Sequence, residues 1–187
     1  MVNAPDLVFY VLMALYGWVE PANPNIPAQD TSHFHTLTNA IVATCGDPSE
    51  DPLPQYSNSY TPSSSIYHDD VNRYKGCVLM ASIAFMETHL YKHIFDGHCG
   101  LMGRWECDYG HSFTPWQFYV QQGGYCIDQV LWHYCNHGIN GPDLVKSPEL
   151  AAKLAYHMLR NAPNAWTTYK WAKPFADSYI IAHPYPY

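Results

Sequence analysis

Glu87 is the side chain in this sequence best suited to acid–base chemistry. It follows Phe85 and Met86 and precedes Leu90, near the end of the strongest apolar helical pattern in the chain. Apolar surroundings disfavour the ionised form of a carboxyl, so they raise its pKa and let it act as a general acid. The alternative interpretation is an ordinary glutamate on the polar face of a helix.

Two histidine pairs have spacings that could present imidazoles to a metal ion. His33 and His35 are separated by one residue, and His89 and His93 stand four residues apart, as on one helix face. Neither pair has an HExxH pattern or a carboxylate at a supporting spacing. We therefore expect surface or stacking histidines and no metal site. Activity lost in a chelator and restored by zinc would favour a metallohydrolase instead.

Other catalytic motifs are missing from the sequence. The segment 110–114 lacks the second glycine of a nucleophile elbow, and nothing predicts a strand before it. No glycine-rich phosphate loop occurs either. A serine nucleophile is therefore not expected, and neither is a cofactor.

The composition is that of a folded, acidic and aromatic-rich chain. It has 187 residues, of which 48% are hydrophobic and 13% charged, enough for a buried core. The net charge of −7, with no basic cluster, argues against nucleic-acid binding. The 16 Tyr, 6 Trp and 7 Phe suit either a stiff core or a cleft in which sugar rings stack.

The six cysteines contain no CxxC pair, which favours three disulfides in an oxidising compartment over free or metal-bound thiols. The sequence does not determine their pairing, and we expect neighbours to pair: 45–77, 99–107 and 126–135. The apolar run 7–19 is too short to span a bilayer, so no membrane span is expected. It also lacks the basic region of a signal peptide and is not interpreted as one. The oligomeric state is unknown.

Apolar periodicity and end signals predict a mainly α fold. The expected helices are 7–19, a helix capped by Thr31 or Ser32 that ends at Cys45–Gly46, 69–93, a helix starting at Thr114–Pro115, a helix carrying Cys126 and Cys135, and a helix from Ser147 to Asn161. Residues 21–27 are expected to form a linker and 47–66 a long surface loop. The glycine-rich stretch 94–113 is expected to be loop or a small irregular hairpin.

Two segments resemble motifs of the lysozyme-like lytic transglycosylases. Residues 80–88 (MASIAFMET) resemble the family's helix that ends in a Glu-Ser pair. About thirty residues on, 110–117 (GHSFTPWQ) is similar to the family's Gly-Ala-x-Gly-Leu-Met-Gln turn. The two motifs occur in this chain in the same order as in the family.

Three further segments fit the same family. Residues 97–99 and 107–110 resemble a cysteine-paired insertion of some bacterial and phage members. The helix pattern 151–159, followed by Trp166 and Tyr169, fits a later helix and its Trp/Tyr landmark. The resemblance spans roughly residues 70–171, a little over half the chain.

The resemblance implies a single mainly α, lysozyme-like domain with disulfide staples. Residues 69–187 would form the catalytic domain, and residues 1–68 would add N-terminal helices and a Pro/Ser-rich loop packed on it. The implied activity is cleavage of peptidoglycan between N-acetylmuramic acid and N-acetylglucosamine, more as a transglycosylase than as a hydrolase. The partner would be the glycan strand, and the location secreted, periplasmic or virion-associated.

The resemblance also implies roles for particular residues. Glu87 would protonate the glycosidic oxygen and then act as base while the muramyl 6-hydroxyl closes a 1,6-anhydro ring. Gln117 would bind substrate or hold the cleft wall beside it. The remaining candidates for substrate contact are Ser112, Trp116, Tyr119, Tyr125 and Tyr169, with packing in the core as the alternative for the aromatic ones.

Three alternatives stay open. A hydrolase usually needs a second carboxylate, for which Asp96, Glu106 and Asp108 are available, although Asp108 suits a turn beside Cys107 better. Thr88 stands where the family usually has Ser, and the Glu-Thr pair is also close to family 19 chitinases, which share this fold with goose-type muramidases. A disulfide-stapled, non-enzymatic wall-binding or virion protein is the third alternative.

Overall fold

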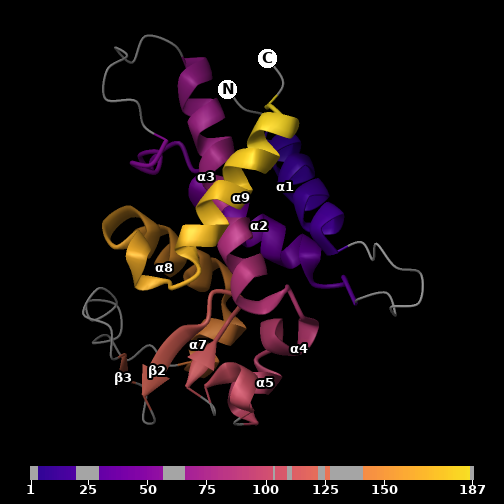
Figure 1. Ribbon diagram of the computed structural model, residues 1–187, viewed down its shortest axis with the longest axis vertical. Helices are drawn as coiled ribbons and strands as arrows, with labels where there is room; N and C mark the ends of the chain where they lie inside the picture. The colour runs from indigo at the N-terminus through magenta and orange to yellow at the C-terminus, as the bar shows by residue number, and fades with distance from the viewer. Residues whose placement is uncertain are drawn as a thin grey trace.

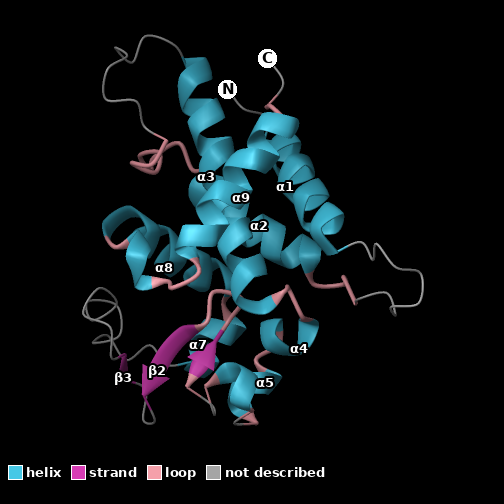
Figure 2. Cartoon of the chain, in the orientation of Figure 1, coloured by secondary structure: helices cyan, strands magenta, loops and turns pink. Residues whose placement is uncertain are grey.

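A computed structural model of the chain describes residues 4–19, 30–56, 66–102, 104–108, 111–121, 125–126 and 141–185. Helices make up most of these residues, and short strands occur only at one end of the molecule (Figures 1 and 2). The predicted mainly α fold is therefore confirmed. Within the described residues, no helix combines the length and the apolar character that a membrane crossing needs.

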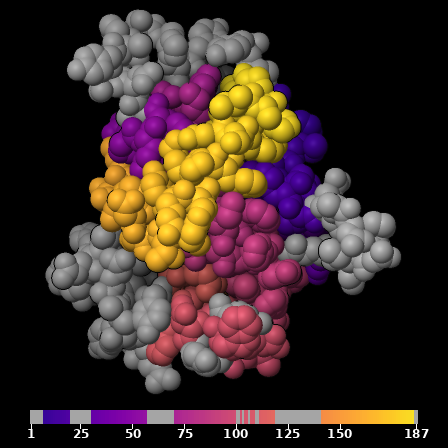
Figure 3. Space-filling view, viewed as in Figure 1, coloured from indigo at the N-terminus to yellow at the C-terminus, as the bar shows by residue number. Residues whose placement is uncertain are grey.

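The larger end of the molecule is a group of helices built around α3. Its members are α1 (Ala4–Val19), α2 (Phe34–Cys45), α3 (Ile66–Thr88), α8 (Pro148–Asn161) and α9 (Tyr169–Ala182). Helix α3 contacts α1, α2 and α9, and α2 also packs on α8. Figure 3 shows α9, in yellow, lying across the face of the molecule in front of the magenta α3.

The N-terminal helices belong to the same core as the rest. Leu7 and Leu15 of α1 are buried in one hydrophobic cluster with Phe34 of α2 and Ala172 of α9. Helices α1 and α2 thus pack in one core with the later helices, and position 68 lies inside α3. The two parts share one core.

The smaller end carries short elements. They are α4 (Lys92–Phe95), α5 (His98–Leu101), the 3₁₀ helix η1 (Trp105–Cys107), β1 (Ser112–Phe113), β2 (Phe118–Gln121), β3 (Tyr125–Cys126) and α7 (Gly141–Lys146). The three strands form an antiparallel sheet in the order β1-β2-β3, with Ser112 opposite Tyr119 and Phe113 opposite Phe118. The stretch 94–113 therefore contains short helices that its glycine content did not suggest.

One predicted helix at this end is wrong, and a second lies mostly on residues that are not described. Thr114–Pro115 does not start a helix, because Thr114 and Gln117 have φ angles of 70° and 50°, which place 114–117 in the turn between β1 and β2. Cys126 lies in β3, not in a helix, and Cys135 lies outside the described residues.

The long helix predicted over 69–93 is interrupted. Helix α3 ends at Thr88 because His89 and Leu90 adopt left-handed φ angles of 48° and 57°. Leu90 is only 1% exposed, and its carbonyl accepts a hydrogen bond from Nε2 of His33 at 2.8 Å. The apolar periodicity correctly marked Leu90 as a core residue, but the residue reaches the core through a turn.

The helix ends follow the sequence signals in part. Ser147 caps α8 as predicted, accepting a hydrogen bond from the backbone N–H of Leu150 at 3.3 Å. Helix α2 ends at Cys45 and Gly46 as predicted, but its N-cap is His33, with no side-chain hydrogen bond, and not Thr31 or Ser32. Helix α9 was not predicted, because Pro174 inside it and its tryptophan-rich start obscured the pattern.

Part of the predicted surface loop is anchored to the helices. Leu53 is fully buried, Tyr56 Oη donates a hydrogen bond to Asp177, and Arg73 donates to the carbonyl of Asp47. Residues 47–56 are thus packed against and hydrogen-bonded to the helices. Residues 57–65 and the predicted linker 21–27 lie outside the described residues.

Two of the three expected disulfides are confirmed. Cys45–Cys77 joins α2 to α3 with a Cα–Cα distance of 5.4 Å, and Cys99–Cys107 closes the segment from α5 to η1 with 5.7 Å. All four cysteines are buried. The pair 126–135 falls on residues that are not described.

We expect the two disulfides to contribute unequally to stability. They close segments of 32 and 8 residues, for which the chain-entropy model gives about 3.7 and about 2.5 kcal/mol. The double variant Cys45→Ala/Cys77→Ala should therefore lose more free energy of unfolding in urea than Cys99→Ala/Cys107→Ala. An equal or reversed order would contradict this account.

Candidate active site

Glu87 lines a cavity of about 390 Å³ at the point where α3 ends. The cavity walls come from the end of α3, from the turn and helix α4 that follow it, and from η1. The lining residues are Glu87, Thr88, His89, Tyr91, His93, Ile94 and Trp105. The volume falls in the usual range for small-molecule sites, about 300 to 1,000 Å³.

The environment of the Glu87 carboxyl favours its protonated form. Burial among apolar neighbours is the largest influence and raises its pKa, and the negative charge of Asp108 raises it further. The hydroxyl of Thr168 donates a hydrogen bond to Oε1 and opposes these two effects. Glu87 also lies in the last turn of a 23-residue helix, where the helix dipole disfavours a negative charge.

Thr168 is a site residue that the sequence did not reveal. It is the N-cap of α9, which places its hydroxyl against α3. Trp166 fixes this corner, because its Nε1 donates to the carbonyl of Trp116 at 2.8 Å. Trp116 in turn donates from Nε1 to the carbonyl of Met80 on α3 at 3.1 Å. A chain of hydrogen bonds thus ties the start of α9 to the helix that carries Glu87.

Left-handed backbone occurs where α3 ends and in the turns of the smaller end. Among the described residues other than glycine, φ is positive at His89, Leu90, Asp108, Thr114 and Gln117. Each such residue costs roughly 1 kcal/mol or more, so it persists only where the surrounding structure holds it. Such strain is typical of functional sites, and His89, one of these residues, lines the Glu87 cavity.

Two aromatic side chains at the cavity are open to solvent. Trp105 is 72% exposed and Tyr91 is 46% exposed. The ring of Tyr91 stacks on that of His93 with centroids 5.6 Å apart. Neither residue stood out as a candidate in the sequence. The signal for Trp105 was its place between Cys99 and Cys107, a pair that fixes the backbone around it.

Gln117 supports the wall of the site and has no described contact with Glu87. Its Nε2 donates to the carbonyl of Thr114 at 3.2 Å and approaches Sγ of Cys107 at 3.7 Å. Cys107 directly precedes Asp108, whose charge acts on Glu87. Both Gln117 and Glu87 therefore adjoin the 107–108 turn.

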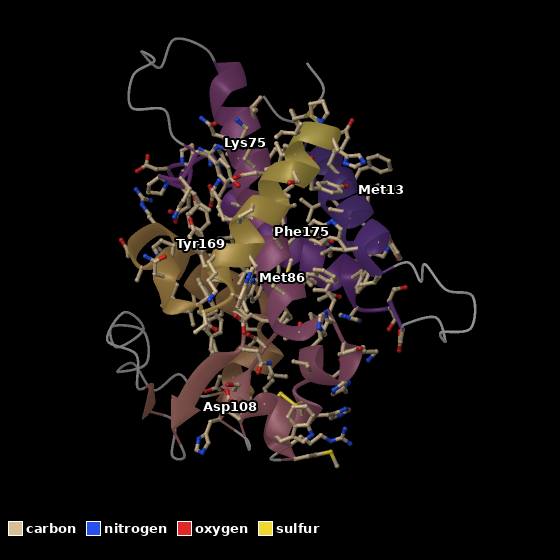
Figure 4. The ribbon with its side chains drawn as sticks, in the orientation of Figure 1. Met13, Lys75, Met86, Asp108, Tyr169 and Phe175 are labelled. Atoms are coloured by element: carbon tan, nitrogen blue, oxygen red, sulfur yellow. A yellow bond between two sulfur atoms is a disulfide. The ribbon has the colours of Figure 1, made fainter. Side chains whose placement is uncertain are left out.

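Several predicted contact residues have other roles. Trp116 and Ser112 are buried, so their side chains do not face a ligand; Ser112 donates a hydrogen bond to the carboxylate of Asp108. Tyr169 interacts with Gln55, while its neighbour Thr168 contacts Glu87. Figure 4 shows Tyr169 toward the helical end and Asp108 at the opposite, smaller end.

Nothing is described for the side chains of two further candidates, Tyr119 and Tyr125. Their backbone lies in β2 and β3. Glu106, proposed as a second carboxylate, lies in η1 and its side chain is likewise not described. Asp96 forms an ion pair with Lys92, four residues before it. Among the described side chains of these candidates, Asp108 is therefore the remaining exposed carboxylate near the site.

Neither histidine pair presents two imidazoles on one helix face. His33 is buried against Phe34 and Phe95, whereas His35 is exposed. His89 and His93 both line the Glu87 cavity, but they are separated by the end of α3. In the described part of the chain, no three His, Cys, Asp or Glu side chains are grouped so as to hold a metal ion.

A second cavity, of about 610 Å³, lies between α1 and the end of α9. Its lining is aromatic and aliphatic: Phe9, Tyr10, Met13, Gly17, Trp18, Tyr179, His183 and Pro184. None of these described lining residues carries a carboxyl group. The Glu87 cavity is therefore the better candidate for acid–base chemistry, although it is the smaller of the two.

Comparisons of the chain with protein-family models, with curated proteins and with solved structures gave no match. What the Glu87 cavity can do is therefore inferred from its own chemistry.

Replacing the two polar neighbours of Glu87 should shift its pKa in opposite directions. Thr168→Val removes the hydrogen bond to the carboxylate and raises the pKa, whereas Asp108→Asn removes a negative charge and lowers it. Titration of the Glu87 carboxyl carbon by NMR, assigned with Glu87→Gln, measures both shifts. The matched change Thr167→Val, at the exposed neighbouring position, should leave the value unchanged. Shifts of the same sign in the first two variants would contradict the assignment.

Proposed function

We propose that this protein is a glycosidase that cleaves peptidoglycan between N-acetylmuramic acid and N-acetylglucosamine, with Glu87 as the catalytic acid and base. The observation that carries the proposal is the partly buried Glu87 carboxyl, with its raised pKa, at an open cavity walled by exposed aromatic rings. A retained proton is what a general acid needs, and aromatic faces suit sugar rings.

The backbone at Thr114 supports the resemblance to the lytic transglycosylases. Its φ of 70° lies in the region that favours glycine, and the family has glycine at this position of its turn. The sequence differs there, yet the conformation is the one that glycine would adopt. The Cys99–Cys107 disulfide agrees with the cysteine-paired insertion of some members.

The chemistry requires one carboxyl that changes its protonation state twice. Glu87 first donates its proton to the glycosidic oxygen, and the bond from that oxygen to C1 of the muramyl residue breaks with help from the substrate's acetamido group. The ionised Glu87 then takes the proton of the muramyl 6-hydroxyl, whose oxygen bonds to C1 and closes the 1,6-anhydro ring. Glu87 ends the cycle protonated, and no water is consumed.

Hydrolysis on the same site is a second candidate, because Asp108 supplies a second carboxylate. Its charge acts on Glu87, and Ser112 donates a hydrogen bond that holds it. A second carboxylate can activate water in a hydrolase. The two disulfides suit a secreted, periplasmic or virion-associated protein in either case.

Digestion of purified murein tests the proposal. We expect wild-type protein to release muropeptides, and mass spectrometry to find the 1,6-anhydro form, which lacks one water relative to a hydrolysed product. Glu87→Gln should reduce the release at least about 100-fold, because loss of a general acid costs that order of rate. The control Glu149→Gln changes an exposed glutamate of α8 and should retain full activity.

The outcomes separate the alternatives. Products with a reducing end would show that the protein is a hydrolase and not a transglycosylase. Cleavage of chitin without cleavage of murein would show that the substrate is chitin. Full activity in Glu87→Gln, or no activity in the wild type, would contradict the proposed function.

A further inference from the structure

We propose that Trp105 and the stacked pair Tyr91–His93 form a sugar-binding subsite at the Glu87 cavity, which takes the ring of a neutral N-acetylhexosamine. The inference rests on the proposed function for its choice of sugar. The observation behind it is independent of that function: two exposed aromatic side chains line the same cavity as the acid.

Trp105 combines an exposed ring with a fixed backbone. The ring is 72% exposed, whereas Cys107 two residues on is buried and bonded to Cys99. The backbone N–H of Cys107 donates to the carbonyl of Arg104 and that of Asp108 to the carbonyl of Trp105, both at 3.1 Å. A ligand that stacks on this indole therefore does not have to order the segment that carries it, which favours affinity.

Tyr91 is held in a similar way by its neighbours. Its ring stacks on that of His93 at an interplanar angle of 24°, and it meets the ring of His89 edge-on with centroids 6.1 Å apart. Both histidines line the cavity as well. The Tyr91 ring is thus in contact with two imidazole rings while 46% of the residue stays exposed.

The ligand class follows from the chemistry of these walls. A pyranose has an apolar face of C–H groups, which suits an aromatic ring, and a rim of hydroxyls, which suits imidazole and carboxyl groups. Ile94 adds an apolar surface on which an acetamido methyl can pack. The negative charge of Asp108 and the chain's net charge of −7 disfavour a sugar that carries a carboxylate. The aromatic subsite should therefore take N-acetylglucosamine and leave muramic acid to the far side of Glu87.

Calorimetric binding of tri-N-acetylchitotriose, a neutral probe, tests this subsite. The full chain is used both as wild type and as Glu87→Gln, so that turnover does not interfere. We expect Trp105→Ala to weaken binding about tenfold, the order of one aromatic stacking contact, and Trp105→Phe to retain most of the affinity. Trp171→Ala is the matched control, because Trp171 is 56% exposed but lies on α9, outside the cavity.

Unfolding curves serve as the check on structure, since removing an exposed ring should leave the free energy of unfolding nearly unchanged. Unchanged affinity in Trp105→Ala, equal losses in Trp105→Ala and Trp171→Ala, or no binding of the trisaccharide by the wild type would overturn the subsite. Trisaccharide binding that depends on Trp105, in a protein that does not cleave murein, would keep the subsite and reject the proposed function. Murein cleavage with an unchanged KM in Trp105→Ala would keep the proposed function and reject the subsite.

Discussion

The constraint on which the site depends is the position of one carboxyl at the end of a buried helix. Helix α3 passes through the core and ends one residue after Glu87, because the next two residues turn left-handed. This turn places Leu90 in the core, and the carbonyl of Leu90 accepts a hydrogen bond from His33 of the N-terminal region. The carboxyl is therefore left beside apolar groups, at the negative end of the helix dipole, with access to a cavity. These features all favour the protonated acid.

The smaller end of the molecule completes this arrangement. The turn of the hairpin β1–β2 does not contribute an exposed side chain to the cavity. Instead, Trp116 in this turn links α3 to the start of α9 through two hydrogen bonds, which places Thr168 against Glu87. The Cys99–Cys107 disulfide holds the segment that brings Trp105 and Asp108 to the same region. Gly97 is required where this segment begins, because its φ is 74° and a Cβ there would lie 2.6 Å from a methyl group of Val145.

Local signals in the sequence predicted the elements that local interactions determine. The periodic helices, the Ser147 cap and two cysteine pairs were found, and apolar neighbours selected Glu87. The end of α3 and the turn at Thr114 were missed, because positive φ at a residue other than glycine is imposed by tertiary packing. Thr168 was missed because a contact across 81 residues leaves no pattern in the chain. Trp116 was a candidate for substrate contact because an indole suits a sugar cleft as well as a core, and its burial in the structure decides for the core.

The pH dependence of stability tests most directly whether burial penalises the charged form of Glu87. A native pKa raised above the unfolded value of about 4.3 means that the native state binds the proton more tightly. The stability from this group is then present in full below the unfolded pKa and is lost as the pH rises through the native pKa. Urea unfolding of the wild type and of Glu87→Gln between pH 4 and pH 8 should therefore show the variant gaining free energy of unfolding relative to the wild type as pH rises. A difference that stays constant or falls would show that the carboxylate is well solvated, and Glu87 could not then be the acid.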